Sequence, residues 1–309
     1  MSDRPRAFLE LPAGLASVSL RLHGGRHCRP PISRMGNKAG YAEVILGALG
    51  LRSGSGADAY LWAEADPDVR ALLRAYPDAA MLTRIAEIIR GWADEEPRAL
   101  WERLRAERKA RGPESAQQTA EWVAVQGVQY GSYPLWTGTS GGFDSPAGTL
   151  SMHPNRLPDG GGLWPATASD ACASLAAYAT IAASSRWPPV AVLSAIPTAA
   201  DVALWLGTPG DLSGCVVYMD PPYVGTTGYG SNLTRDEVID HALDFDALGA
   251  VVCISEAEPV IDTWYATEIT GGRRGQKRTF SKQQAEYLTM NRPPHATVAT
   301  QVSMFGAPT

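Results

Sequence analysis

The sequence lacks the features of a disulfide-bonded, zinc-binding, membrane-spanning or strongly basic protein. Its four cysteines form no C-x-x-C pair, which argues against a zinc cluster and against a disulfide framework; they are Cys28, Cys172, Cys215 and Cys253. No apolar run reaches 18 residues, and the N-terminus lacks a basic-then-apolar signal, so we expect a cytoplasmic protein without a membrane span. The net charge of −5 excludes a generally basic surface. Any contact with DNA must therefore come from local patches.

What the sequence does contain is enough apolar material for one large core. The 309 residues are 45% hydrophobic, which suits an enzyme-sized α/β domain with a smaller inserted lobe. Short apolar runs bounded by turn residues predict interior parallel strands at Tyr60–Ala63, Val190–Ser194, Cys215–Met219 and Ala250–Ser255. Helical spacing predicts helices at Tyr41–Leu51, at 68–108 as two helices, at Ala171–Ser184 and at Arg235–Leu248.

This alternation predicts a Rossmann-like fold, with a mostly parallel sheet and helices on both faces. Ligands of such sheets gather at the carboxyl ends of the strands, so the residues just after each strand are the ones to examine. The first 32 residues show no sustained periodicity, and we interpret them as an N-terminal arm without a function of its own.

The run CVVYMDPPYVGTTGY places Asp220, Pro221, Pro222 and Tyr223 directly after the apolar strand at 215–219. Two prolines cannot continue a strand ladder, so backbone carbonyls there face a crevice. The exocyclic amine of a nucleobase needs such acceptors, because hydrogen bonds to Asp220 and to the Pro221 carbonyl would free its lone pair for methyl transfer. Tyr223 offers a ring on which an extruded base can stack. The alternative is a simple exit from strand to loop, since Asp, Pro and Tyr are common in turns.

With this motif the sequence resembles the DNA adenine methyltransferases of the Dam type. The segment SRMGNKAGYAEVIL is similar to that family's W-x-G-G-K signature, and the resemblance implies that Lys38, with Met35 and Gly36, contacts the cofactor S-adenosyl-L-methionine. LWAEADPDV is similar to the segment whose acid binds the ribose hydroxyls, which implies Glu64 with Asp66 as its neighbour. A carboxylate suits a diol because it accepts both hydroxyl protons.

The resemblance extends along most of the chain. Phe143, Asp144, Pro146 and Gly148 match the family's F-N-x-P-x-G stretch, and Ser255-Glu256 matches a strand that ends in Ser-Asn. The closing segment resembles a basic loop followed by an E-x-x-x-x-N strand, with Glu286 and Asn291. It implies phosphate contacts from DNA-binding residues Arg273, Arg274, Lys277 and Arg278. A solvated charged loop is the competing interpretation.

Two departures concern the cofactor half of the site. The glycine-rich motif that the family has between the lysine and the second-strand acid is absent, and only RSGSGA, residues 52–57, occupies that interval. The Asp-aromatic pair that reads the cofactor adenine is replaced by Ala195-Ile196, so Ile196 would supply an apolar contact instead. The cofactor site is therefore either remodelled or lost.

The leading hypothesis is a site-specific adenine-N6 methyltransferase that acts on double- or single-stranded DNA, without a metal, as a monomer or weak dimer. The alternatives are methylation of cytosine N4 or of another amine, and a degenerate relative that binds DNA without catalysis. The expected domains are an arm at 1–32, a catalytic domain at 33–110 and 190–300, and a partly helical target-recognition lobe at 111–189.

Overall fold

The computed structural model describes residues 4–25, 28, 30, 38–92, 94–95, 99, 103, 175–177, 179–183, 187–221, 233–269 and 286–295. The strands are β1 (Ala7–Glu10), β2 (Tyr60–Ala63), β3 (Val190–Leu193), β4 (Cys215–Met219), β5 (Val251–Glu256), β6 (Tyr265–Ile269) and β7 (Glu286–Met290). The helices are α1 (Ser17–Gly24), η1 (Lys38–Gly40), α2 (Ala42–Ala48), α3 (Pro67–Ala75), α4 (Ala79–Gly91), α8 (Ala199–Trp205) and α9 (Arg235–Ala247). Within these ranges, no helix is long and apolar enough to cross a membrane.

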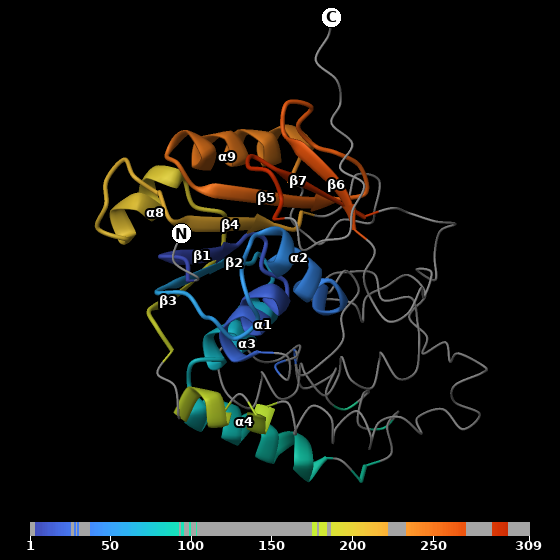
Figure 1. The fold of residues 1–309 in the computed structure, drawn as a ribbon. Helices are drawn as coiled ribbons and strands as arrows, with labels where there is room; N and C mark the ends of the chain where they lie inside the picture. Colours follow the sequence, from blue (N-terminus) through green and yellow to red (C-terminus); the bar gives the residue numbers. More distant parts are fainter. Residues whose placement is uncertain are drawn as a thin grey trace, which may run out of the picture.

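The strands form one seven-stranded sheet in the order β3-β2-β1-β4-β5-β7-β6 (Figure 1). The first five strands in this order are mutually parallel, whereas β7 runs antiparallel to both β5 and β6. The predicted mostly parallel α/β sheet is thereby confirmed. The four strands predicted from their apolar runs are all present, with boundaries shifted by no more than one residue.

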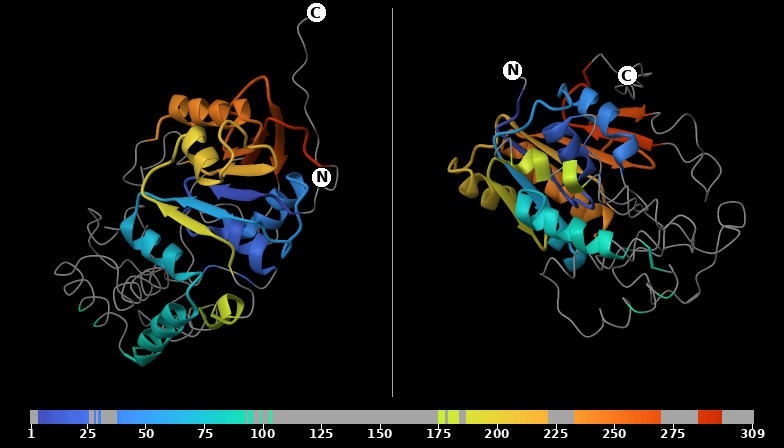
Figure 2. Two further views of the ribbon diagram at one scale, coloured as in Figure 1. Left: turned by 90° about the vertical axis from the view of Figure 1, so that its left-hand side faces the viewer. Right: turned by 90° about the horizontal axis from the view of Figure 1, so that it is seen from below.

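Both faces of the sheet are covered, which explains why the parallel strands are mainly apolar. Phe8, Tyr60 and Tyr218 point into one buried cluster, which α1, α2, α3 and α4 close. Leu9 and Val217, one residue along, point into a second cluster that α8 and α9 close. Figures 1 and 2 show α8 and α9 on one side of the sheet and α1 and α2 on the other. The charged side chains of the parallel strands are found at the carboxyl ends of these strands.

The prediction of an N-terminal arm over residues 1–32 is wrong for residues 7–24. The strand β1 lies at the centre of the sheet, where Phe8 pairs with Tyr60 of β2 and with Val216 of β4. It is followed by a turn and by α1, which packs in the first buried cluster. The strand escaped detection because its apolar run stands among Pro, Gly and Arg residues without sustained periodicity, and because both partners are distant in sequence.

Two further elements were not predicted from the sequence. They are the helix α8, where the Thr198 hydroxyl accepts a hydrogen bond from the Asp201 N–H as an N-cap, and the strand β6 at the sheet edge. The predicted lobe at 111–189 and the other domain boundaries fall largely outside the described residues and stay predictions. The helix predicted at 171–184 is helical at 175–177 and 179–183.

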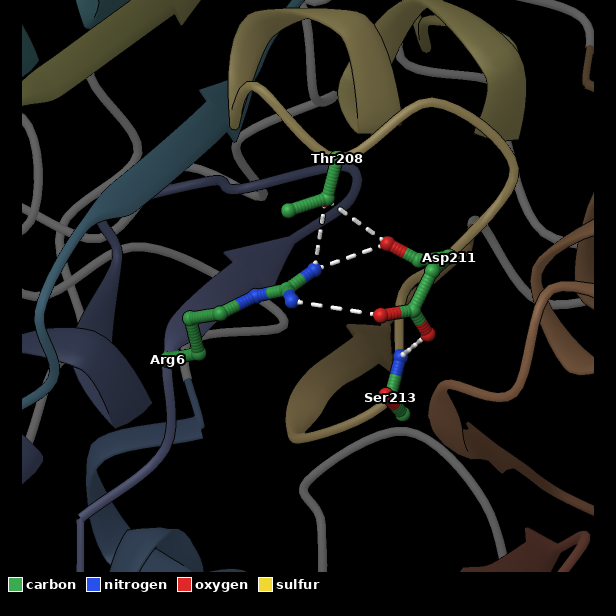
Figure 3. Close-up of polar contacts among 4 residues, drawn as sticks. All are labelled: Arg6, Thr208, Asp211 and Ser213. Carbon is green, nitrogen blue, oxygen red and sulfur yellow. Dashed lines mark hydrogen bonds and ion pairs between the residues drawn. The ribbon is translucent and has the colours of Figure 1, made fainter.

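The amino-terminal end of the sheet is held by Arg6, just before β1 (Figure 3). Its guanidinium donates to the Asp211 backbone carbonyl at 2.7 Å and to the Thr208 hydroxyl at 2.8 Å, and it lies 3.5 Å from the Asp211 carboxylate. That carboxylate also accepts the Ser213 N–H at 2.8 Å. Arg6 therefore fastens β1 to the loop between α8 and β4.

We expect Arg6→Ala to lower the free energy of unfolding by about 1–3 kcal/mol, because the variant loses hydrogen bonds from a charged donor. Urea denaturation followed by circular dichroism measures this. Arg84→Ala is the matched control, since Arg84 is exposed and pairs only within its own helix, and it should change stability by less than about 0.5 kcal/mol. Equal effects from the two variants would contradict the role of Arg6.

Candidate functional site at the carboxyl edge of the sheet

The order of the strands places a topological switch point between β1 and β4. From β1 the sheet continues through β2 to β3 in one direction, and from β4 it continues to β5 in the other. The loops that follow β1 and β4 therefore depart on opposite sides, and open α/β sheets bind ligands outside the carboxyl ends of the strands at this switch point. Asp220 follows β4 directly, and Glu10 is the last residue of β1.

The carboxylate of Asp220 is anchored through one of its two oxygens. Oδ1 lies 2.8 Å from the Lys38 ammonium and accepts the Ser255 hydroxyl at 2.9 Å. Among the contacts recorded for the described residues, Oδ2 has none. The side chain retains 20% exposure, so one oxygen is fixed in the protein while the other is available to a ligand.

Lys38 joins three separate segments of the chain. Its ammonium, 3% exposed, also lies 3.2 Å from Oε1 of Glu286, the first residue of β7. Because β7 runs antiparallel to β5, its first residue comes to the same edge as the ends of the parallel strands. Lys38 and Asp220, both predicted from the sequence, are thus brought together. The additional ion pair with Glu286 was not foreseen.

Opposing effects act on the ionisation of Asp220. Burial raises the pKa of the Asp220 carboxyl, and the nearby Glu286 carboxylate raises it further. The Lys38 ammonium and the Ser255 hydroxyl bond favour the charged form and lower the pKa, but the net direction is upward. Asp220 therefore holds a proton more readily than an exposed aspartate does.

Glu10 is a site residue that the sequence reasoning missed. The side chain is 2% exposed, and its Oε2 accepts the Ser19 N–H at 2.8 Å and the Ser19 hydroxyl at 2.6 Å. Its Oε1 accepts the Val18 N–H at 3.3 Å. Glu10 thereby caps the first turn of α1, for which the N-cap residue Ala16 has no side-chain acceptor. The available signal was an acid that ends the apolar run AFLE before a glycine-containing turn.

Glu64 ties the turn after β1 to the end of β2. Its Oε2 accepts the Gly14 N–H at 2.9 Å, and its Oε1 accepts the Asp66 N–H at 3.0 Å. Gly14 has a φ of +50°, a conformation that favours glycine. These two bonds hold the Glu64 carboxylate between the turn after β1 and the end of β2.

Of the other predicted site residues, three lie within the described part of the chain. Asp66 is buried just before α3, and Ile196 follows β3 and packs, half-buried, on the second cluster. Pro221 is buried next to Asp220. The remaining predictions lie outside the described residues and stay predictions; they concern Met35, Gly36, Pro222, Tyr223, Arg273, Arg274, Lys277 and Arg278.

Comparison with known proteins adds no assignment. The chain matches no protein-family model, and no curated protein is significantly similar to it. The interpretation of the site therefore depends on its own chemistry.

That chemistry is dominated by negative charge. Six buried or partly buried carboxyl groups of the described residues lie at this edge, and Lys38 contacts two of them, Asp220 and Glu286. The other four are those of Glu10, Glu64, Asp66 and Glu256. The N-terminus of α1, which in many α/β sheets binds a phosphate, has its N–H groups turned to Glu10. The arrangement suits a ligand with a positive charge and with N–H or O–H donors.

Glu10 makes folding stability depend on pH. Burial raises the pKa of this carboxyl from 4.5 to about 7, so between these values the native state binds more protons than the unfolded state. Its contribution to stability is complete below pH 4.5 and is lost as the pH rises toward 7. The difference amounts to roughly 3 kcal/mol.

Urea denaturation at several pH values between 4.5 and 8 tests this with Glu10→Gln. The variant has no titrating group at this position, so the fall in the free energy of unfolding across that range should be smaller than in the wild type by that amount. Glu87→Gln, at an exposed position of α4, should keep the wild-type slope. Parallel curves for Glu10→Gln and the wild type would show that Glu10 does not titrate in this range.

Proposed function

We propose that the chain is an S-adenosylmethionine-dependent DNA amino-methyltransferase that transfers a methyl group to N6 of an adenine flipped out of the duplex. The observation that carries the proposal is the state of Asp220. The acid of the D-P-P-Y motif lies at the switch point of the sheet, with Oδ1 anchored by Lys38 and Ser255 and with Oδ2 left for a donor. An exocyclic amine is such a donor.

The charge of the edge supports a cationic cofactor over a phosphate-bearing one. In dinucleotide-binding sheets of the order 3-2-1-4-5, the pyrophosphate sits at the N-terminus of the first helix. Here the Glu10 carboxylate occupies that position and would repel a phosphate. The sulfonium and amino groups of S-adenosylmethionine are positive, and its ribose diol suits a carboxylate such as that of Glu64, which can accept both hydroxyl protons.

The position of β1 also weakens the main argument for a degenerate relative. That argument was the absence of a glycine-rich turn between Lys38 and Glu64. A strand, a turn containing Gly14 and a helix are instead present before Lys38, and the Gly14 N–H binds Glu64. The chain therefore has a candidate for the missing unit, in a different order along the sequence from the one expected.

The residues at the edge suggest how the reaction would proceed. Bound S-adenosylmethionine supplies a methyl group on a sulfonium. Asp220 Oδ2 and the Pro221 carbonyl accept the two N–H groups of the target amine, which turns its lone pair out of conjugation with the ring. Transfer leaves one proton in excess on the amine nitrogen, and Asp220, whose pKa is raised, is placed to take it. Positioning and polarisation are then the main contributions to catalysis.

The test is to incubate the protein with unmethylated DNA and S-adenosylmethionine, digest the DNA to nucleosides and identify methylated species by mass spectrometry. We expect N6-methyldeoxyadenosine. Asp220→Asn should lower kcat on the order of 10²–10³-fold, because a neutral amide no longer polarises the amine. Asp236→Asn is the control, since Asp236 is exposed on α9 and should leave the rate unchanged.

The same digest separates the competing functions. N4-methyldeoxycytidine would move the target to cytosine and keep the mechanism. Binding of DNA with no methylated nucleoside, on single and double strands, would favour the non-catalytic relative. A wild-type rate in Asp220→Asn would remove the catalytic assignment of the motif.

Glu64→Gln tests the cofactor half separately. The amide keeps the size of the side chain but loses one acceptor and the charge, so we expect the dissociation constant for S-adenosylmethionine to rise about 10–100-fold. Isothermal titration calorimetry measures it directly, with Glu87→Gln as the control. An unchanged dissociation constant would show that Glu64 serves only to hold the turn at Gly14.

A further inference from the structure

We infer that Tyr218 and Ser255 are positioning residues that orient the Asp220 carboxylate and reserve its Oδ2 for the substrate amine. The catalytic part of this inference rests on the proposed function. Its structural content, the control of one carboxylate oxygen by two buried hydroxyls, can be tested whether or not the protein methylates DNA.

The three groups form a continuous chain across two neighbouring strands. Tyr218 of β4 and Ser255 of β5 are both fully buried, and their hydroxyl oxygens lie 2.9 Å apart. The Ser255 oxygen lies a further 2.9 Å from Asp220 Oδ1. Tyr218 and Asp220 are two residues apart in the chain, so they emerge on the same side of the sheet. Ser255 bridges them from the next strand.

The direction of the hydrogen bonds follows from Lys38. An ammonium only donates, so Asp220 Oδ1 must act as an acceptor toward it. The Ser255 hydroxyl has one hydrogen, which it donates to the same Oδ1. Ser255 can then only accept from Tyr218, and the chain runs from Tyr218 through Ser255 to Asp220.

This direction distinguishes the two oxygens of Asp220. Oδ1 receives two donors and is held in the negative form, so both an incoming proton and the target amine go to Oδ2. The charged groups that face Asp220 are Lys38 from η1, Glu286 from β7 and Glu10 from β1. Two of the three are acids, which makes the hydroxyl donation from Ser255 important for keeping Asp220 ionised.

A purely structural role is the competing explanation, because two buried hydroxyls satisfy each other in any core. In that case their removal would change stability but not the ionisation of Asp220. If they position Asp220, Ser255→Ala should move its titration to higher pH, because a hydrogen bond to the charged form is lost. Tyr218→Phe should shift the titration in the same direction but more weakly. The Ser255 hydroxyl still donates to Asp220 in this variant, but it no longer accepts the Tyr218 hydrogen bond that polarises it.

The experiment titrates the Asp220 carboxyl by ¹³C NMR in protein labelled at aspartate Cγ, with Asp220→Asn to assign the signal. Ser255→Ala, Ser255→Thr and Tyr218→Phe are compared with the wild type after circular dichroism has shown that each is folded. Tyr60→Phe is the matched control, because Tyr60 is equally buried but begins β2 at the opposite edge of the sheet. The pH dependence of kcat for methyl transfer is recorded on the same proteins.

We expect the titration and the acid limb of kcat to move to higher pH in Ser255→Ala, with kcat about tenfold lower near neutral pH and KM little changed. Ser255→Thr should restore both, and Tyr60→Phe should resemble the wild type. An Asp220 titration that stays at its wild-type pH in Ser255→Ala would overturn the inference, even if the enzyme is active. A shifted titration in a protein without methyltransferase activity would support the positioning while removing the proposed function.

Discussion

The site depends on one buried ammonium group, that of Lys38. It contacts Asp220 after β4 and Glu286 at the start of β7, and so joins three segments that are far apart in the sequence. Such a buried ion pair adds little net stability, but the loss of one partner would leave an uncompensated charge. Lys38 therefore contributes mainly by fixing the positions of the groups that it contacts. It engages one oxygen of Asp220, and it partly compensates the acids that lie at this edge of the sheet.

The concentration of acids at this edge follows from the construction of the sheet. Its central strands are buried on both faces mainly by apolar side chains, so their charged groups are placed where a strand ends. Glu10, Glu64 and Asp220 all occur within one residue of the end of a parallel strand. Each is compensated locally, Glu10 and Glu64 by backbone N–H groups and Asp220 by Lys38 and Ser255.

The sequence predicted those parts of the fold and site that have a local signal. The strands at 60–63, 190–193 and 215–219 are apolar runs between turns, and Asp220 was identified because two prolines follow it. β1 has the same kind of signal, but it lies among Pro, Gly and Arg residues that obscure it, and its partners are about 50 and 200 residues away. The contacts of Lys38 with Asp220 and Glu286 arise only when β4 and β7 reach the same edge, and sequence spacing cannot show that.

The same geometry explains why a sheet with the strand order of a dinucleotide-binding domain can favour a different kind of ligand. A helix N-terminus attracts anions when its N–H groups are open to the crevice. In this chain Glu10 accepts hydrogen bonds from those N–H groups, so the partial positive charge of α1 is used within the protein and this edge of the sheet is left with an excess of carboxylates. A substitution of Glu10 would free the N–H groups of α1 and make the edge less negative. The residue at position 10 therefore bears on the ligand class, in addition to the topology of the sheet.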